Sequence, residues 1–471
     1  MMNVLLLNPP YIEKKKIFMK EIGRCGSTAS GNQFWPQTGL AYLAAVAEQE
    51  HNVKIIDGIA EQLNFDEILK VVKQFNPEVI LIHTTTPTFK NDSLVLELLK
   101  KEHNSRYGFV GNHVSNTVLE TLKETGADFV LINEPEWTFK ELLEKIEEDW
   151  STIKGIGYKK KGKAVINGLR VMKDNLDELP LPARHLLPNK KYRMVLTNNE
   201  PFATIVPSRG CPYSCIYCRV GYPWGKRFRK RSVENVYREM AEVKNKFSIN
   251  NIVFMADTFT LDKIWVLDLC KKIVDEKLQV NWFCNSRIDS IDKEMAHAMK
   301  EAGCSLVSFG VESGNQEILN RAKKNVDLNK AKYAIKVTQD AGIRAFAYFI
   351  IGLPGETNES IKKTIKFAKS LNPDYVNFHI ATPHPGTELQ EMAEKNGWIM
   401  DYDYEHYDQS GNYSVMRNEN LSAEEIYKAQ KKAMKDYYLR PTQVIKQISR
   451  VRKPKDLVDM VKIGLKVVRG Q

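Results

Sequence analysis

The chain of 471 residues lacks several features that would place it in a specialised class. It has no run of about 18 apolar residues, so no segment is predicted to cross a bilayer. Its first residues lack the basic region and cleavage site of a secretory signal, so the expected location is the cytoplasm. Seven cysteines are too few for a disulfide scaffold in a chain of this length. The apolar fraction of 43% and the charged fraction of 27% are those of a folded globular protein with two or three domains.

Positive charge is concentrated at the end of the chain. The net charge is +11, and residues 430–471 carry twelve Lys or Arg against three Asp. The rest is nearly neutral, so no nucleic-acid partner is expected. Within the tail, six residues repeat at helical spacing with basic neighbours, which is typical of an anchor on anionic lipid. They are Leu457, Met460, Val461, Gly464, Leu465 and Val468. The alternatives are a helix packed on the protein body and a contact with nucleic acid.

The first 150 residues alternate short apolar runs with helix-length amphipathic segments, for example 39–48 and 65–74. This alternation predicts a Rossmann-like α/β domain with a parallel sheet, whose ligand lies at the carboxyl ends of the strands. No G-x-G-x-x-G follows the first strand, which argues against a dinucleotide. The expected strands are 3–7, 53–56, 79–83, 108–110 and 128–131.

A second alternating series begins at Phe202 and predicts a partial (βα)6 barrel of the TIM type. Its expected strands are 202–206, 252–255, 280–284, 306–309, 345–350 and 376–380. The intervening segment contains a hairpin pattern and a Pro-stiffened connector. The expected domains are a Rossmann-like domain (1–150), a linker with a hairpin (151–200), the barrel (201–395) and a helical region with a basic end (396–471).

Three of the seven cysteines fall within eight residues, directly after the first barrel strand. Cys211, Cys215 and Cys218 form a C-x3-C-x2-C pattern, which can bind three irons of a [4Fe–4S] cluster and leave the fourth iron open. A structural zinc site is the alternative, but it needs four N or S ligands. No second CxxC exists, and His185, the nearest histidine, lies beyond a strand. The pattern therefore favours the iron–sulfur cluster.

The segment CPYSCIYC, placed after a strand at the start of six βα units, resembles the radical S-adenosylmethionine (SAM) superfamily. The N-terminal domain resembles the cobalamin-binding domain of its cobalamin-dependent branch. The resemblance implies three cofactors: a [4Fe–4S] cluster, SAM and cobalamin. It also implies that SAM chelates the open iron and is cleaved to methionine and a 5′-deoxyadenosyl radical. The electron for this cleavage comes from a donor such as flavodoxin or ferredoxin.

The resemblance assigns nine further residues at strand ends to the SAM site. They are Tyr217, Asp257, Asn285, Arg287, Gly310, Glu312, Ser313, Gly352 and Pro354. Tyr217 and the 352–354 turn are expected near adenine, and the 310–313 segment near the amino group or ribose of SAM. Without the resemblance, GLPG and GVESG are ordinary turns.

The cobalamin assignment departs from the family pattern at two points. The D-x-H-x-x-G motif is absent, because Ile59 stands where its histidine would fall, and Asn112 replaces the second glycine of a Gly-Gly pair. Since members of this branch also bind the cofactor without a histidine ligand, we expect Thr84, Gly111 and His113 near it. The alternative is a flavodoxin-like module that has lost its cofactor and shapes the substrate pocket.

The arrangement most resembles the group of the anaerobic magnesium-protoporphyrin monomethyl ester cyclase and the hopanoid and ether-lipid enzymes. It implies hydrogen abstraction from an unactivated carbon of a hydrophobic lipid, isoprenoid or tetrapyrrole-like substrate, in anaerobic lipid biosynthesis. Methyl transfer and C–C or ring formation both remain open. A small-molecule C- or P-methyltransferase is one alternative, and a lipid- or nucleic-acid-binding protein with a structural metal is another. The basic run 226–231 is either a solvated face or a stabiliser of the cluster or of anionic substrate groups.

Overall fold

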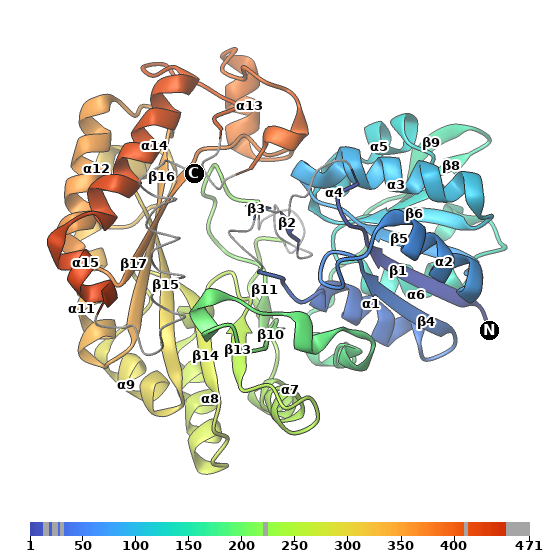
Figure 1. Cartoon of the computed structure of the whole chain (residues 1–471), viewed down its shortest axis with the longest axis horizontal. Coiled ribbons are helices and arrows are strands. Elements are labelled where there is room, and N and C mark those ends of the chain that lie inside the picture. The colour runs from blue at the N-terminus through green and yellow to red at the C-terminus, as the bar shows by residue number, and fades with distance from the viewer. Residues whose placement is uncertain (13–17, 21–26, 29–32, 220–224, 409–412, 449–471) are drawn as a thin grey trace.

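The computed structural model describes residues 1–448 except 13–17, 21–26, 29–32, 220–224 and 409–412. Two lobes lie side by side, each built on a mainly parallel sheet (Figure 1). Within these described residues, no helix combines the length and the apolar character needed to cross a membrane. The basic amphipathic segment 455–471 lies outside the described residues.

The N-terminal lobe contains a seven-stranded sheet in the order β4-β1-β5-β6-β7-β8-β9. Its strands are β1 (Asn3–Asn8), β4 (Asn52–Asp57), β5 (Val79–His83), β6 (Arg106–Val110), β7 (Phe129–Leu131), β8 (Ile156–Lys160) and β9 (Lys163–Ile166). Its helices are α1 (Thr38–Ala47), α2 (Phe65–Phe75), α3 (Phe89–Glu102), α4 (Asn112–Asn116), α5 (Val118–Glu124) and α6 (Glu136–Glu144). The first five strands are parallel, whereas β8 pairs antiparallel with β7, so the hairpin expected beyond residue 150 extends this sheet.

Alternating side chains of β1 bury both faces of the N-terminal sheet. Val4 and Leu6 pack in the core that contains α1 and α6, whereas Leu5 and Leu7 pack in the core that contains α2 and α3. This follows from the two-residue period of a strand, and it explains why the strands are apolar throughout.

The second lobe contains a six-stranded parallel sheet in sequence order, which confirms the expected partial barrel. Its strands are β10 (Phe202–Ile205), β13 (Asn251–Phe254), β14 (Asn281–Arg287), β15 (Cys304–Glu312), β16 (Arg344–Ile351) and β17 (Tyr375–Ile380). Its helices are α7 (Val233–Asn245), α8 (Lys263–Asp275), α9 (Lys293–Glu301), α10 (Gln316–Arg321), α11 (Leu328–Asp340), α12 (Asn358–Leu371), α13 (Glu388–Lys395), α14 (Ala423–Tyr438) and α15 (Pro441–Ile448).

The two lobes share apolar packing. Phe202, Phe283 and Leu306 of the barrel belong to the same buried cluster as α1 of the N-terminal lobe. The hydroxyls of Thr38 and Thr204 lie 2.5 Å apart across this contact. These contacts hold the two lobes against each other.

Candidate functional site

The three cysteines lie on a loop that two short strands close at its base. β11 (Ser208–Arg209) and β12 (Arg229–Lys230) pair antiparallel, and β11 lies between the two lobes (Figure 1). Gly210 has a φ of +87°, and a Cβ on it would lie 2.1 Å from the carbonyl oxygen of Arg227. Only glycine therefore allows the first residues of the loop to lie directly against its last residues.

Backbone hydrogen bonds hold the middle of the loop against the barrel. The amide of Ile216 donates to the Ala322 carbonyl at 3.1 Å, and the Ile216 carbonyl accepts from the Leu389 amide at 2.9 Å. All three thiols are half-buried, and burial raises the pKa of Cys211, with the charge of Asp257 adding to the rise. Within the described part of the chain, no three His, Cys, Asp or Glu side chains lie close enough together to bind a single metal ion. The cluster assignment rests on the motif and its place at the strand ends, where three thiolates on one loop fit a [4Fe–4S] cluster.

Glu312 and Lys324 form a buried ion pair beside the loop. Lys324 Nζ donates to Glu312 Oε1 at 2.9 Å, and a Cβ on Gly310 would lie 2.4 Å from that oxygen. Burial raises the pKa of Tyr217, and the charges of Glu312 and Cys215 raise it further, so Tyr217 lies close to both. Sequence reasoning missed Lys324, because no motif marks it and its partner lies on a different element.

Arg287 is held directly over the cysteine loop. Its guanidinium lies 3.5 Å from the centre of the Tyr213 ring and pairs with Asp289 at 2.9 Å. β14 continues to Arg287, so Arg287 and the half-buried Asn285 are the last residues of this strand rather than residues after it. Stacking on an aromatic face is a preferred environment of arginine, and here it joins the strand end to the loop.

Three residues that were expected near SAM make contacts within the turns that border the site. The Ser313 hydroxyl lies 3.2 Å from that of Thr364 and accepts from the Asn315 amide. Gly352, at φ +95°, faces α14, because a Cβ on it would lie 2.9 Å from Ile426. Pro354 is buried in the same turn. These contacts stabilise the turns that border the site.

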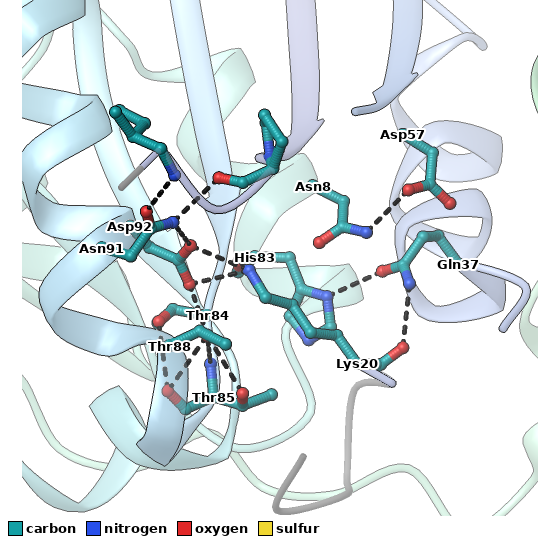
Figure 2. Close-up of polar contacts among 12 residues, drawn as sticks. Asn8, Lys20, Gln37, Asp57, His83, Thr84, Thr85, Thr88, Asn91 and Asp92 are labelled. Carbon is teal, nitrogen blue, oxygen red and sulfur yellow. Dashed lines mark hydrogen bonds and ion pairs between the residues drawn. The ribbon is translucent and has the colours of Figure 1, made fainter. Parts of the chain in front are cut away.

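A second group of polar side chains lies at the carboxyl ends of β1, β4 and β5 (Figure 2). Asn8 donates to Asp57 Oδ1 at 2.7 Å, and the Tyr192 hydroxyl donates to Oδ2 at 3.0 Å. Burial raises the pKa of Asp57 to about 6, although these hydrogen bonds oppose the rise. Lys20 and Asp92 form a fully buried ion pair at 2.8 Å beside this group.

The hydrogen bonds of Gln37 determine the tautomer of His83 (Figure 2). Gln37 Nε2 donates to the Lys20 carbonyl, so its Oε1 faces His83 Nδ1, at 2.8 Å. Nδ1 therefore carries the hydrogen, while burial and the charge of Lys20 lower the pKa of His83 well below its usual range. His83 Nε2 is a buried acceptor without a hydrogen-bond partner among the described atoms.

The neighbouring loops fit a large cofactor rich in amide groups. Gly111 has a φ of +137°, and a Cβ on it would lie 2.0 Å from the Thr84 carbonyl oxygen, so backbone alone lines this edge. Asn112 Nδ2 and both ring nitrogens of His113 are buried without partners in the described structure. Each such atom costs about 1–3 kcal/mol unless a ligand satisfies it. Since the corrin ring carries amide side chains, these residues fit cobalamin.

The basic run 226–231 is divided between exposed side chains, as a solvated face would have, and buried ion pairs that neither sequence interpretation included. Arg229 and Arg231 are buried and pair with Glu134 and Glu239, whereas Lys230 is exposed. Side chains alternate between the two faces of an extended segment, which explains why Arg229 and Arg231 are buried while Lys230 between them is exposed. The two buried arginines are structural ion-pair partners.

The chain matches two protein families in succession. Residues 26–143 match the B12 binding domain, and residues 205–368 match the Radical SAM superfamily. An uncharacterised methyltransferase of Pyrococcus horikoshii is 37% identical over 451 residues, which are 95% of each chain. The anaerobic magnesium-protoporphyrin IX monomethyl ester cyclase of Rubrivivax gelatinosus is 26% identical over 395 residues, covering 81% of this chain and 70% of the cyclase.

The fold also matches a solved structure. The radical SAM methyltransferase TsrM of Kitasatospora setae, solved with cobalamin and a [4Fe–4S] cluster, superimposes with a TM-score of 0.70 at 15% identity. The match covers 94% of this chain and 89% of TsrM. The chain therefore belongs to the cobalamin-dependent radical SAM enzymes, whose cofactors are a [4Fe–4S] cluster, SAM and cobalamin.

Proposed function

We propose that this enzyme transfers a methyl group to an unactivated carbon of a hydrophobic substrate. The observation that carries the proposal is the position of the cysteine loop against the carboxyl ends of the N-terminal strands. At the loop's base, Arg209 donates to Glu136 at 2.6 and 3.2 Å. Beyond its last cysteine, Arg219 donates to the Asn112 carbonyl. The two cofactor-binding edges thus share one seam, and relatives named as methyltransferases favour methyl transfer over ring closure.

When bound, the cluster and SAM supply the 5′-deoxyadenosyl radical, and cobalamin supplies the methyl group. The chain's own residues bind and orient these groups. Cys211, Cys215 and Cys218 would hold the cluster, and Tyr217 and the Glu312–Lys324 pair, which lie close together, would border SAM. A buried ion pair offers both an acceptor and a donor to the amino acid end of SAM, and its own contact keeps the two groups in place.

A cluster of aromatic rings supports an apolar substrate. The His113 ring lies 4.4 Å from Phe89 and 4.7 Å from Tyr404, and Tyr404 lies 5.3 Å from Tyr407. Burial and the charge of Arg219 lower the pKa of His113 to about 3, so its ring is neutral at physiological pH. We propose that a lipid, isoprenoid or tetrapyrrole-like substrate would bind next to these largely buried rings, because they make the region beside Arg219 apolar and poor in water.

The proposal is tested by mass spectrometry of the products from SAM. Protein purified anaerobically after growth with hydroxocobalamin is reconstituted, reduced and incubated with SAM, with and without a total lipid extract. Extract-dependent formation of 5′-deoxyadenosine and S-adenosylhomocysteine in similar amounts supports methyl transfer, because each methylation consumes SAM in both roles. Extract-dependent 5′-deoxyadenosine without S-adenosylhomocysteine overturns it in favour of ring closure or C–C bond formation.

The Cys211→Ala variant tests the cluster assignment. Removing one of three thiolates should abolish iron loading and lower 5′-deoxyadenosine formation by at least about 1,000-fold, roughly 4 kcal/mol in barrier terms. Cys270→Ala is the matched control, because Cys270 is buried in the barrel core away from the loop. Full iron content in Cys211→Ala, measured by a colorimetric iron assay, would contradict the assignment.

A further inference from the structure

Arginines of the cysteine loop reach the N-terminal lobe at two levels. At the base, Arg209 and Arg229 pair with Glu136 and Glu134, which follow β7. At the far end, Arg219 donates to the Asn112 carbonyl and contacts the Thr86 hydroxyl at 3.4 Å. Arg219 is only 4% exposed, so these contacts are shielded from water.

The contacts of Arg219 join the two cofactor sites over a very short path. Arg219 follows Cys218 directly, and consecutive Cα atoms lie about 3.8 Å apart, so the backbone of this cysteine moves with that of Arg219. In the N-terminal lobe, the backbone at Gly111 lies against the carbonyl of Thr84. The two partners of Arg219 are close to this point in the sequence, because Asn112 follows Gly111 and Thr86 lies two residues beyond Thr84. Any shift of these loops when a corrin binds is therefore passed to the cluster loop through hydrogen bonds.

The surroundings of Arg219 also favour one defined position for its side chain. His113 of the N-terminal lobe and His384 of the barrel both have pKa values lowered to about 3, by burial and by the charge of Arg219. Neutral imidazoles from both lobes therefore surround the guanidinium and do not repel it. Five N–H groups in a rigid plane allow arginine to bind acceptors on two loops at once, which a lysine ammonium does less well.

We propose that Arg219 is a positioning residue that couples the two cofactor sites, so that loading of the cluster strengthens cobalamin binding and the reverse. The proposal rests on the placement of the cofactors given above. Coupling between two sites is reciprocal by thermodynamic necessity, and it typically amounts to about a 5- to 150-fold change in affinity. Breaking the connecting contact removes the coupling even where each site still binds its own cofactor.

The test measures the Kd for hydroxocobalamin on full-length protein with and without its cluster. The coupling factor is the ratio of these two constants, and it is compared among the native protein, Arg219→Gln, Arg219→Lys and Arg227→Gln. Arg227→Gln is the matched control, because Arg227 lies in the same loop but is 73% exposed and pairs with Asp174 at the surface.

We expect a factor of at least about 5 in the native protein and in Arg227→Gln, about 1 in Arg219→Gln, and an intermediate value in Arg219→Lys. If Arg219 had only a structural role, the Arg219→Gln substitution would raise the Kd for hydroxocobalamin by the same factor with and without the cluster. The ratio of the two Kd values would then be unchanged. An unchanged ratio in Arg219→Gln, or a ratio of 1 in the native protein, overturns the proposal. A native protein that binds no iron or no cobalamin would instead overturn the cofactor placement, and the coupling with it.

Discussion

At the scale of single residues, the protein stabilises buried carboxyl groups in two different ways. Burial alone would raise the pKa of Glu239, but Arg231 and Arg184 outweigh it and lower the pKa, so this group stays charged. Glu356 is also fully buried, and among the described residues its Oε2 accepts hydrogen bonds from the amides of Gly352 and Leu353 alone. Burial raises the pKa of Glu356 to about 8, so the folded protein keeps it protonated at neutral pH.

The Glu356→Gln variant should change how stability depends on pH. Between the ordinary pKa of 4.5 and about 8, the unfolded chain loses the proton of Glu356 while the folded chain keeps it. The unfolding free energy therefore falls by about 1.4 kcal/mol per pH unit as pH rises through this window. Glutamine keeps the acceptor and cannot ionise, so the variant should gain stability relative to the native protein as pH rises. Urea unfolding at a series of pH values measures this difference, and parallel curves would contradict the assignment.

At the scale of elements, the sequence predicted most strands to within about two residues, because their signal is local. It placed the end of β14 too early, since the polar residues after Cys284 end the apolar run. The ladder nevertheless continues, pairing Asn285 with Ser308 and Arg287 with Gly310. The three-cysteine motif could be recognised from spacing alone, whereas the contact of Arg219 with Asn112 could not, because the two residues are 107 positions apart in the chain.

The Gly111→Ala variant tests the loop after β6 as part of the cobalamin site. A Cβ would lie 2.0 Å from the Thr84 carbonyl oxygen, so one of the two loops must shift. We expect cobalamin binding to weaken at least about tenfold, or roughly 1.4 kcal/mol, while the variant still binds iron. Gly162→Ala is the control, since Gly162 also has a positive φ, of +78°, but no atom lies within 4 Å of its Cβ position. Equal cobalamin affinity in both variants, measured by the change in corrin absorbance, would argue against this edge as the site.

At the scale of the whole molecule, buried ion pairs join the lobes and were not visible in the sequence. The basic run was recognised only as a charge cluster, because Glu134, the partner of Arg229 across the lobes, is 95 residues away in the chain. Removing one partner of such a buried pair costs about 3–5 kcal/mol, since it leaves an uncompensated charge. Long-range pairs of this kind hold the seam between the lobes, and their partners are chosen by the fold rather than by local pattern.

The end of the chain adds a surface whose partner we propose to be anionic lipid. In the last described helix, α15, the side chain of Ile445 is 66% exposed. In the sequence of the tail, which lies outside the described residues, apolar positions between Leu457 and Val468 recur at the spacing that one face of a helix would have, and basic residues flank them. Near an anionic surface each Lys or Arg contributes about 1 kcal/mol, an attraction that salt screens.

Deleting residues 455–471 should therefore release the protein from phosphatidylglycerol vesicles while cluster loading is unchanged. A full-length variant with Leu457, Val461 and Leu465 changed to Ser keeps the charge and isolates the apolar contribution. Co-sedimentation should fall at least about tenfold for the deletion and by less for the serine variant, because the charges remain. Phosphatidylcholine vesicles should bind neither the native protein nor the variants. Equal sedimentation of deleted and native protein with phosphatidylglycerol would contradict the proposal that the tail binds anionic lipid.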